Sequence, residues 1–386
     1  MELIRNTNIN FLGKRKLGFF LSAVLIIVGL ISLGIHSGPN FGIDFRGGVK
    51  IRAKFNRPVT EKELKSKLAQ LGYDRPKIQE DPAKQEASID IRYQPEFENQ
   101  KISAGLASDP GDATAASLPI RPAEEYVHLF QPGDVIQIVE GDERSRNEIG
   151  EIVEQDGMIT FELVKPAGVD FTSGAIVQMQ SSAGRTLSDA LLRGDSDWHA
   201  LPQGVNVSEV GPSVGKDLKW AALWSILWSI VILLLYISWR FEFRFAVGAI
   251  AALIHDVLIT LGIFSLLVKE INLPTVAAFL TIIGYSLNDT IVVFDRIREN
   301  TNLFKGVDYV DIINQSINQS LSRTIITSLT TFFVVLTIFT LSSPGEEINT
   351  FAFALIVGVL VGTYSSIFVA SPILHAWHVR NQRQAA

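Results

Sequence analysis

The sequence predicts a polytopic α-helical membrane protein with six transmembrane helices and one α+β domain outside the membrane. Three observations support this fold class. Long apolar segments recur along the 386 residues, charged residues make up only 19% of the chain, and one connection between apolar segments is large enough to fold by itself. Globular domains carry a charged share nearer ~25%.

The composition excludes several other classes of protein. A hydrophobic share of 47% rules out a chain that is disordered throughout, because disorder needs low hydrophobicity and high charge. The absence of cysteine excludes disulfide frameworks, zinc–thiolate sites, iron–sulfur clusters and cysteine nucleophiles. The formal net charge of −6 gives no basic footprint for nucleic acid. We therefore expect no metal, no cofactor and no nucleic-acid partner.

Six segments are long enough to cross a hydrocarbon core of about 30 Å as helices. Their predicted bounds are Leu17–Ile35, Trp220–Trp239, Phe245–Val268, Leu273–Phe294, Thr324–Leu341 and Phe351–Pro372. Basic residues precede the first segment, as in a signal peptide. That segment is nevertheless longer than a typical apolar signal region of about 7–15 residues, and no A-x-A cleavage site follows it. We therefore expect a retained signal anchor.

Basic residues in the short connections predict the orientation of the six spans. If the spans alternate, one side collects Arg5, Lys14, Arg15, Lys16, Arg240, Arg244, Arg296, Arg298, Lys305, Arg323, Arg380 and Arg383. The short connections on the other side carry Lys269 beside Glu270, and then Glu346 and Glu347. We therefore expect residues 1–16 and 373–386 to lie in the cytoplasm. Four tryptophans of the second span are expected to contact membrane lipid: Trp220, Trp224, Trp228 and Trp239.

Residues 36–219 are the one connection large enough to be a domain, and the orientation places them outside the cytoplasm. Strand patterns occur at Val49–Phe55, Lys77–Gln79, Ala87–Tyr93 and Val205–Val210, and helix patterns at Thr60–Leu71 and Thr186–Leu192. Thr60 and Glu63 have the spacing of a capping box. The order β-α-β-β-α-β predicts a ferredoxin-like split βαβ sandwich.

Residues 94–183 differ in character and predict a small β-module inserted into that sandwich. The stretch opens with a Pro/Gly-rich linker, Gln94–Pro122. Four short strand candidates follow, Asp134–Val139, Glu148–Val153, Met158–Val164 and Ala175–Met179, and turn signals such as Gln155-Asp156-Gly157 separate them.

Residues 295–323, between the fourth and fifth spans, show an amphipathic pattern. Val310, Ile313, Ile317 and Leu321 recur at i, i+3, i+7 and i+11, with Asn and Gln between them. This pattern predicts a helix that lies along the cytoplasmic membrane interface. Simple packing and a regulatory role are both open for it.

Ionisable residues inside apolar spans are the first candidates for function, because a charge there costs at least ~2.5–3.5 kcal/mol on insertion scales. The fourth span holds Asn288 and Asp289, and Arg323 stands at the entrance to the fifth. A guanidinium within ~4–6 Å would keep Asp289 ionised, and its withdrawal would let burial favour the protonated form. These residues predict a proton relay. A static ion pair that locks two helices is the alternative.

Three further polar residues are accessory candidates. Tyr285 lies one turn before Asp289 in the fourth span. His255 and Asp256 are adjacent in the third span, so they point about 100° apart on a helix and are not expected to face one narrow seam equally. Asp256 either joins the relay or bonds a neighbouring helix, and we favour the second. We expect His255 to be a helix–helix hydrogen bonder.

One segment imitates a nucleotide-binding motif. Gly211–Asp217 looks like a phosphate loop, but three residues separate its glycines where four are needed, and Asp217 follows Lys216 in place of Ser or Thr. It also falls on the non-cytoplasmic side. We therefore expect no nucleotide, and we expect a transport subunit, not an enzyme.

Four segments together resemble the SecF family of protein-export membrane proteins, within the resistance–nodulation–division superfamily. They are Phe41–Gly48 (FGIDFRGG), Ser208–Gly215 (SEVGPSVG), His255-Asp256 and Gly284–Glu299 (GYSLNDTIVVFDRIRE). The likeness covers all six spans, their orientation and both flanks of the outer domain. It departs at the outer domain, since the family's domain is much shorter than residues 36–219, and the surplus coincides with the predicted β-module.

The resemblance implies partners, a driving force and a site. It implies pairing with a SecD-like subunit, giving twelve spans from two halves, and work with the SecYEG translocon on unfolded preproteins. It implies late-stage export across the bacterial inner membrane, driven by the proton-motive force, with the outer domain in the periplasm. It places the family's relay aspartate on Asp289 and its relay arginine on Arg323.

Two other hypotheses remain open from the sequence. The first is a proton-driven exporter of small molecules or lipids from the same superfamily, against which the single outer domain argues. The second is a structural scaffold in which Asp289 and Arg323 form a static clasp.

Overall fold

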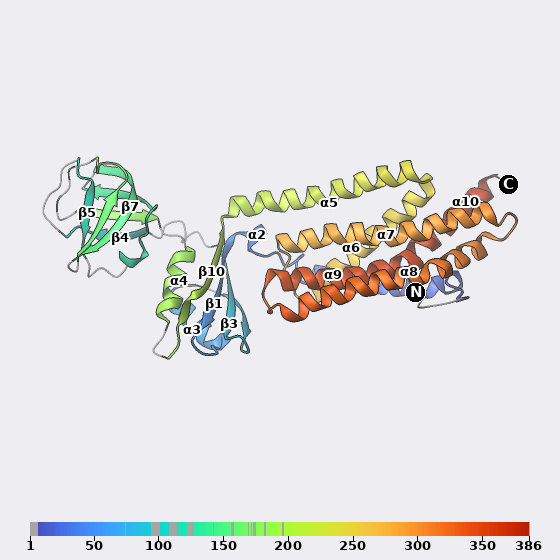
Figure 1. Cartoon of the computed structure of the whole chain (residues 1–386), viewed down its shortest axis with the longest axis horizontal. Helices are drawn as coiled ribbons and strands as arrows, with labels where there is room; N and C mark the ends of the chain where they lie inside the picture. The colour runs from blue at the N-terminus through green and yellow to red at the C-terminus, as the bar shows by residue number, and fades with distance from the viewer. Residues whose placement is uncertain are drawn as a thin grey trace. The chain divides into compact units, whose positions relative to one another are not determined.

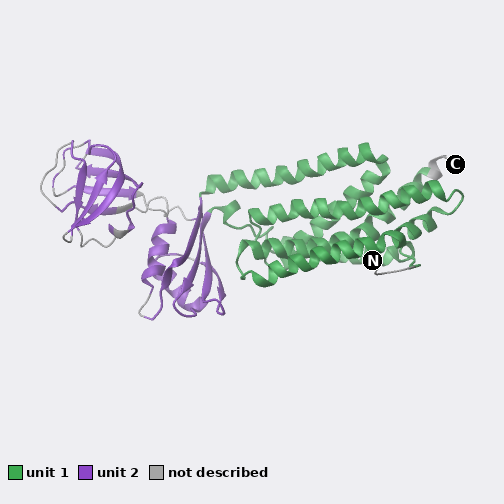
Figure 2. Cartoon of the chain, viewed as in Figure 1, with its two compact units in different colours: residues 1–47, 211–386 green, residues 48–210 purple. Residues whose placement is uncertain are grey.

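The computed structural model divides the chain into two compact units, residues 1–47 with 211–386 (unit 1) and residues 48–210 (unit 2), as Figure 2 shows. The structure describes residues 7–73, 75–93, 101–107, 114–121, 127–141, 143–155, 158–168, 170, 172, 175–180, 183–194 and 197–385.

Unit 1 is a bundle of long helices (Figure 1). Its elements are a 3-10 turn at Leu12–Lys14, α1 (Arg15–Ile35), α2 (Ile43–Arg46), α5 (Pro212–Arg240), α6 (Phe243–Leu266), α7 (Leu273–Leu303), α8 (Tyr309–Leu341), α9 (Glu347–Ser365), a π-helical turn at Ser366–Ala370, and α10 (Ser371–Ala385). Six helices in the described part of the chain are long and apolar enough to cross a membrane, which confirms the predicted fold class. We call the bundle end near Gly47 and Gly211 the linker end, and the opposite end the terminal end.

The helices that carry the fourth and fifth spans are longer than the predicted spans. Helix α7 continues past Phe294 to Leu303, and α8 already begins at Tyr309. The amphipathic residues of 309–323 therefore belong to the same continuous helix as the fifth span and do not form a separate helix. Ile313, Ile317 and Leu321 are buried in the bundle core, so the apolar face packs against neighbouring helices.

The centre of the bundle consists of α6, α7 and α9. In the most apolar stretches of α6, α7 and the sixth span, 56% of the residues are buried, against 6% in α5 and 11% in α8. The four tryptophans of α5 are each more than half exposed, which suits lipid contact. Within the sixth span, Pro372 is the second residue after the π-helical turn. A proline cannot donate to an α-helical bond, and the wider turn accommodates it.

Helices α1 and α6 cross at very short range. Gly29 and Gly262 face each other so closely that a Cβ added to Gly29 would lie 2.7 Å from the Cα of Gly262. One turn further, Ser32 Oγ and Ser265 Oγ are 2.8 Å apart. Small residues allow this backbone approach, and the hydroxyl pair adds an interhelical hydrogen bond.

Unit 2 contains the predicted ferredoxin-like sandwich. Its strands are β1 (Gly48–Phe55), β2 (Lys77–Asp81), β3 (Glu86–Arg92) and β10 (Ala200–Val210), in the antiparallel order β10-β1-β3-β2. Helices α3 (Glu61–Gln70) and α4 (Ala183–Arg193) supply leucines to its core. The predicted capping box is present, because Thr60 Oγ1 accepts from Glu63 N and the Glu63 carboxylate accepts from Thr60 N.

The inserted module is a second sheet with a separate core. Its strands are β4 (Lys101–Gly105), β5 (Ser117–Ile120), β6 (Val135–Glu140), β7 (Glu143–Gln155), β8 (Met158–Leu163) and β9 (Ile176–Gln180), with a 3-10 turn at Val127–Leu129. They pair in the order β4-β9-β6-β7-β8-β5. A bridge between Leu106 and Ile120 joins the two end strands, so the sheet closes into a small barrel.

The structure changes the interpretation of the segment that opens the module. The segment Gln94–Pro122 is not simply a linker, because it contributes β4 and β5, and its buried Leu106, Leu118 and Ile120 belong to the barrel core. Its residues 94–100, 108–113 and 122 lie outside the described residues, as do Asp156 and Gly157 of the predicted turn.

Candidate functional site

Asp289 belongs to a helix whose beginning is fixed by its own sequence. Asn272 caps α7, and its Oδ1 accepts a hydrogen bond of 2.9 Å from Thr275 N. Pro274 lies in the first turn, where amide hydrogens have no partner within the helix, so the missing amide hydrogen of proline costs nothing. Asp289 follows sixteen residues after Leu273, about 24 Å along the axis.

The Asp289 side chain is buried between three helices. It is 2% exposed, and its Oδ2 accepts a 3.3 Å hydrogen bond from Ser328 Oγ on α8. Ser328 Oγ also lies 2.7 Å from Thr363 Oγ1 on α9. The carboxylate of α7 therefore faces two hydroxyls, one directly and one through Ser328.

Arg323 lies on the same helix as Ser328, five residues earlier and so about 7.5 Å nearer the terminal end. It is exposed. The ion pairs recorded among the described residues do not include one between Arg323 and Asp289. In this arrangement, Asp289 bonds to a hydroxyl and the guanidinium stands apart.

Two buried hydroxyls near Asp289 have no hydrogen-bond partner. They are Tyr285 Oη, one turn before Asp289, and Thr324 Oγ1, one turn before Ser328. Unsatisfied buried polar groups are rare in folded proteins, and they often mark places where function needs a polar group. Asn288, predicted as a relay residue, is exposed on the other side of α7 and is not brought together with Asp289 and Ser328.

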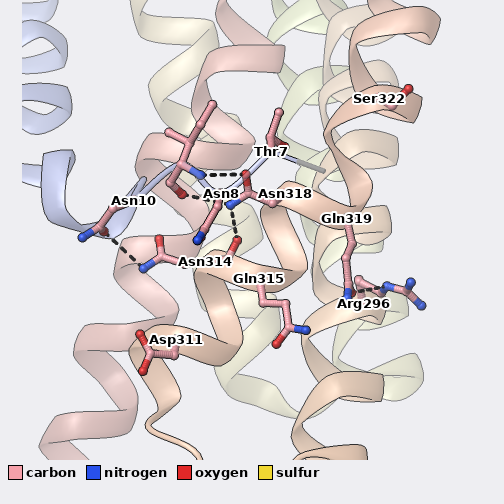
Figure 3. Close-up of a pocket in the computed structure, with 11 residues that line it drawn as sticks. Thr7, Asn8, Asn10, Arg296, Asp311, Asn314, Gln315, Asn318, Gln319 and Ser322 are labelled. Carbon is pink, nitrogen blue, oxygen red and sulfur yellow. Dashed lines mark hydrogen bonds between the residues drawn. The ribbon is translucent and has the colours of Figure 1, made fainter. Parts of the chain in front are cut away.

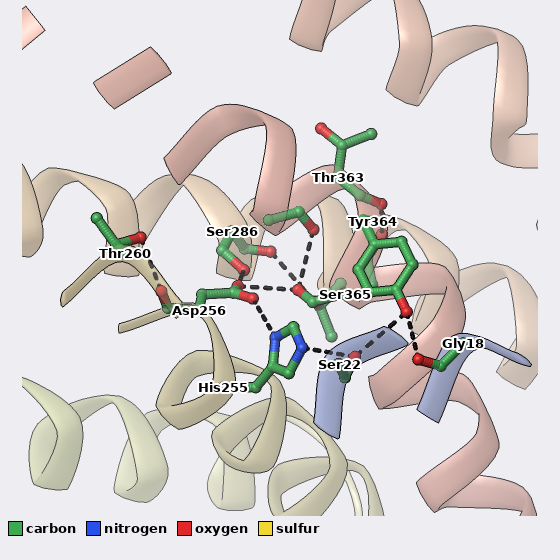
Figure 4. Close-up of polar contacts among 12 residues, drawn as sticks. Gly18, Ser22, His255, Asp256, Thr260, Ser286, Thr363, Tyr364 and Ser365 are labelled. Atoms are coloured by element: carbon green, nitrogen blue, oxygen red, sulfur yellow. Dashed lines mark hydrogen bonds and ion pairs between the residues drawn. The ribbon is translucent and has the colours of Figure 1, made fainter. Parts of the chain in front are cut away.

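Asp256 is the centre of a second polar cluster (Figure 4). The residue is fully buried, its Oδ1 lies 2.9 Å from His255 Nδ1, and its Oδ2 accepts from Ser286 Oγ on α7 and from Ser365 Oγ on α9 at 2.8 Å. His255 Nε2 lies 2.8 Å from Ser22 Oγ on α1. The cluster thus joins four helices.

This geometry agrees with the expectations for both residues and adds one contact. His255 and Asp256 face different neighbours, α1 for His255 and α7 with α9 for Asp256, and they also bond each other at 2.9 Å. Asp256 bonds neighbouring helices, as we favoured, and His255 bonds α1.

A run of hydroxyl residues on α9 connects the two clusters. Thr363 meets Ser328 beside Asp289, and Ser365 donates to Asp256. Between them, Tyr364 Oη donates to Gly18 O at 2.6 Å and lies 3.2 Å from Ser22 Oγ (Figure 4). Three consecutive side chains therefore contact α8, α1 and α6 in turn.

The two buried carboxylates differ in how completely they are bonded. Asp256 has three recorded partners, whereas Asp289 has only the Ser328 hydroxyl among the described residues. A fully bonded buried carboxylate is held in place by its donors. One with a single long hydrogen bond loses little when its protonation state changes.

A polar cavity of about 790 Å³ lies at the terminal end, away from both clusters (Figure 3). The N-terminal segment and the polar face of α8 line it. Asn318 forms two hydrogen bonds with the backbone of Ile9: its Oδ1 accepts from Ile9 N at 3.0 Å, and its Nδ2 donates to Ile9 O at 2.9 Å. Asn314 Oδ1 accepts from Leu12 N at 2.9 Å. The Asn residues of the amphipathic segment therefore anchor the chain before α1.

No group of His, Asp and Glu residues within the described ranges could hold a metal ion. The segment Gly211–Gly215 also fits the G-x-S-x-G spacing of hydrolases around Ser213. Its glycine has a packing role instead. A Cβ on Gly215 would lie 3.0 Å from Gly47 N and 3.1 Å from Phe45 C, so the position requires glycine for this close approach.

The comparisons with known proteins point in one direction. The family model "Protein export membrane protein SecD/SecF, C-terminal" matches residues 198–380, and the model "SecD/SecF GG Motif" matches residues 33–59. The protein translocase subunit SecF of Koribacter versatilis is 38% identical over 390 residues, covering 98% of this chain and 93% of the relative. SecF of Haemophilus influenzae is 33% identical, covering 96% of this chain and 87% of the relative.

Solved structures give the same likeness. The crystal structure of SecDF from Thermus thermophilus, described as a translocon-associated membrane protein, superposes with a TM-score of 0.61 at 28% identity. A second SecDF structure, in a super-membrane-facing form, has a TM-score of 0.54 at 28% identity. In the first comparison, 98% of this chain is covered but only 40% of SecDF, so this chain spans well under half of that protein.

Proposed function

The chain belongs to the SecF family of protein translocase subunits, and from this premise we propose that it couples the proton-motive force to late-stage preprotein export. The family makes it a multi-pass membrane subunit that assists Sec translocation. The proton coupling goes beyond that statement. It rests on the environment of Asp289.

The observation that carries the proposal is the contrast between Asp289 and Asp256. Both carboxylates are buried in the bundle, but Asp289 accepts only one long hydrogen bond, from Ser328 on α8. Arg323 stands on the same helix as Ser328 and forms no ion pair with Asp289 among the described residues. A carboxylate in apolar surroundings is held ionised only by partners, and it takes up a proton when they withdraw. Approach and withdrawal of Arg323 would therefore unload and load Asp289.

The hydroxyls of Ser328 and Thr363 complete the relay. An ionised Asp289 accepts from Ser328, while a protonated Asp289 has an O–H that can donate to a hydroxyl. The two hydroxyls can rotate, so they can bond both the ionised and the protonated carboxyl group. One charge that crosses 100 mV supplies about 2.3 kcal/mol per cycle.

The remaining parts of the proposal concern place and partners. The basic residues of the short connections support an inner-membrane subunit with both termini in the cytoplasm and unit 2 in the periplasm. The partners are a SecD-like subunit, the SecYEG translocon and unfolded preproteins. The chain acts as a transport subunit, not as an enzyme, and Asn288 on the exposed side of α7 is available to a partner helix.

The test is export of secretory precursors in cells depleted of this chain and rescued with variants. Asp289→Asn keeps the shape of the carboxyl group and removes its titration. Asp295→Asn is the matched control, since it makes the same change at an exposed position of α7. Membrane levels of each variant are measured alongside.

We expect precursors to accumulate with Asp289→Asn as they do without the protein, and to be exported normally with Asp295→Asn. Normal export with a stably inserted Asp289→Asn would refute the proton relay at this residue. The static clasp would then be the better hypothesis.

A further inference from the structure

We propose that Asp44 is a positioning residue that ties α7, and with it Asp289, to the two chain connections leading into unit 2. This inference rests on the proposed function, because it takes Asp289 as the place where the proton acts. It adds a route by which a change at Asp289 reaches the outer domain.

The two chain connections that lead into unit 2 lie side by side. The chain passes between the units at Gly47–Gly48 and at Val210–Gly211. Gly48 pairs with Val210 in the antiparallel ladder of β1 and β10, so both connections leave the same end of that strand pair. Any force between the units along the chain must pass through this double connection.

Helix α2 fixes the double connection to the bundle. Phe45 is 6% exposed and packs in a cluster with Phe264, Ile271 and Val276 at the linker end. Gly215, in the first turn of α5, lies directly against the backbone of Phe45 and Gly47. Helix α2 therefore holds both connections together at one point on unit 1.

Helix α2 also bonds the beginning of α7. Asp44 Oδ2 accepts a 2.8 Å hydrogen bond from Leu273 N, one of the amides that a helix cannot satisfy internally. Beside it, Gly42 N donates to Ile271 O and Ile271 N donates to Asn40 O, both at 2.8 Å. The segment before α2 and the segment before α7 thus form a short two-stranded contact.

Asp44 has the electrostatic character that this position favours. The amides at the beginning of a helix carry partial positive charge, and a carboxylate there is stabilised by the helix dipole. From Leu273, α7 runs without a break to Asp289. A helix is stiff along its axis, so a shift of α7 at Asp289 displaces its first amide and pulls on Asp44.

The experiment measures the distance between the two units directly. The chain contains no cysteine, so spin labels can be placed at Lys62→Cys on α3 and Thr340→Cys at the end of α8, both exposed. The full chain is reconstituted in nanodiscs with a cysteine-free SecD-like subunit. The distance distribution is recorded with Asp289 and with Asp289→Asn, in each of four backgrounds.

The backgrounds separate positioning from simple helix capping. They are unchanged Asp44, Asp44→Asn, Asp44→Ala and Thr60→Ala. Asp44→Asn keeps an acceptor oxygen and so serves as the conservative rescue, whereas Asp44→Ala removes the acceptor. Thr60→Ala removes a helix cap of the same kind from α3, within unit 2.

In the backgrounds with unchanged Asp44, Asp44→Asn or Thr60→Ala, we expect Asp289→Asn to shift the distance distribution. In the Asp44→Ala background, we expect that shift to be smaller by at least half. An equal shift with Asp44→Ala overturns the proposal, and so does the absence of any shift when Asp44 is unchanged. If Asp44→Ala does not fold, Asn40→Ala replaces it. That variant removes the 3.0 Å bond from Asn40 Nδ2 to Val268 O in the same contact.

The export assay with Asp289→Asn keeps the two proposals apart. Normal export would refute the proton relay, whatever the distances show. Defective export together with an Asp44-independent shift would leave the relay standing and refute the role of Asp44.

Discussion

The crossing of α1 and α6 at Gly29 and Gly262 makes a sharp prediction about stability. In Gly29→Ala, the new Cβ would lie 2.7 Å from the Cα of Gly262, and ordinary contact begins at 3.4 Å. The helices must separate by the shortfall of about 0.7 Å, because a backbone atom cannot rotate away as a side chain can. The same movement stretches the 2.8 Å hydrogen bond between Ser32 and Ser265 towards its limit.

The magnitude follows from these two effects. Overpacking in a well-packed interior costs about 1–3 kcal/mol, and a weakened interhelical hydrogen bond adds about 0.6 kcal/mol. Alanine also gains up to about 1 kcal/mol of helix propensity over glycine. Gly284→Ala cancels this gain as a control, because nothing lies within 4 Å of a Cβ at Gly284. We therefore expect the two variants to differ by about 2–3 kcal/mol.

The assay is the apparent melting temperature of the purified chain in detergent, followed by tryptophan fluorescence. At roughly 2–4 °C per kcal/mol for a unit of this size, Gly29→Ala should melt about 4–12 °C below Gly284→Ala. Equal melting temperatures for the two variants would show that the close approach of α1 and α6 is wrong.

Three further predictions concern other parts of the chain. Asp256→Ala leaves the donors of Ser286, Ser365 and His255 without their acceptor, at about 1–3 kcal/mol each, so it should lower the melting temperature far more than Asp295→Ala; similar melting of the two variants would contradict the polar cluster. In unit 2, hydrogen bonds from the Arg57 guanidinium and then from Thr60 lower the pKa of Glu63 to about 2, so their stabilisation of α3 should be lost as pH falls from about 4.5 towards 2. Amide exchange of α3 at pH 5 and pH 2.5 checks this, and Glu63→Gln should lack the dependence. Ile138→Ala removes a fully buried side chain from the barrel, at about 2–5 kcal/mol, and should speed amide exchange in residues 127–180 while β1 and β3 keep their protection.

The features that sequence predicted well are those with a local or periodic signal. The capping box at Thr60 depends on residues three apart, and the strands of the ferredoxin-like sandwich follow from alternation and turn residues. The helix that carries the fifth span begins at Tyr309, before the predicted span Thr324–Leu341, because hydropathy marks where a helix enters lipid, not where it begins. No Gly or Pro lies between Tyr309 and Leu341, and this uninterrupted run is the signal for one continuous helix.

The site was only partly predictable. Asp289 stands out because a carboxylate in an apolar span is costly. Ser328 and Thr363 do not, because hydroxyls bond their own helix backbone and occur on any face of a span. The one available signal was the unbroken run Thr363-Tyr364-Ser365-Ser366 in the sixth span. The bond between His255 and Asp256 was missed because the angle between Cα–Cβ directions ignores how far the side chains reach.

The two sheets of unit 2 offer different possibilities to an extended polypeptide. The bridge between Leu106 and Ile120, with the hydrogen bonds from Ala107 N to Pro119 O and from Arg121 N to Gly105 O, closes part of the edge between β4 and β5 and leaves less backbone free there. The ferredoxin-like sheet ends in β10 and β2, and each can accept one more strand by main-chain hydrogen bonding. Strand addition of an extended polypeptide is therefore open at the two edges of the ferredoxin-like sheet, whereas the barrel offers mainly side chains and loops.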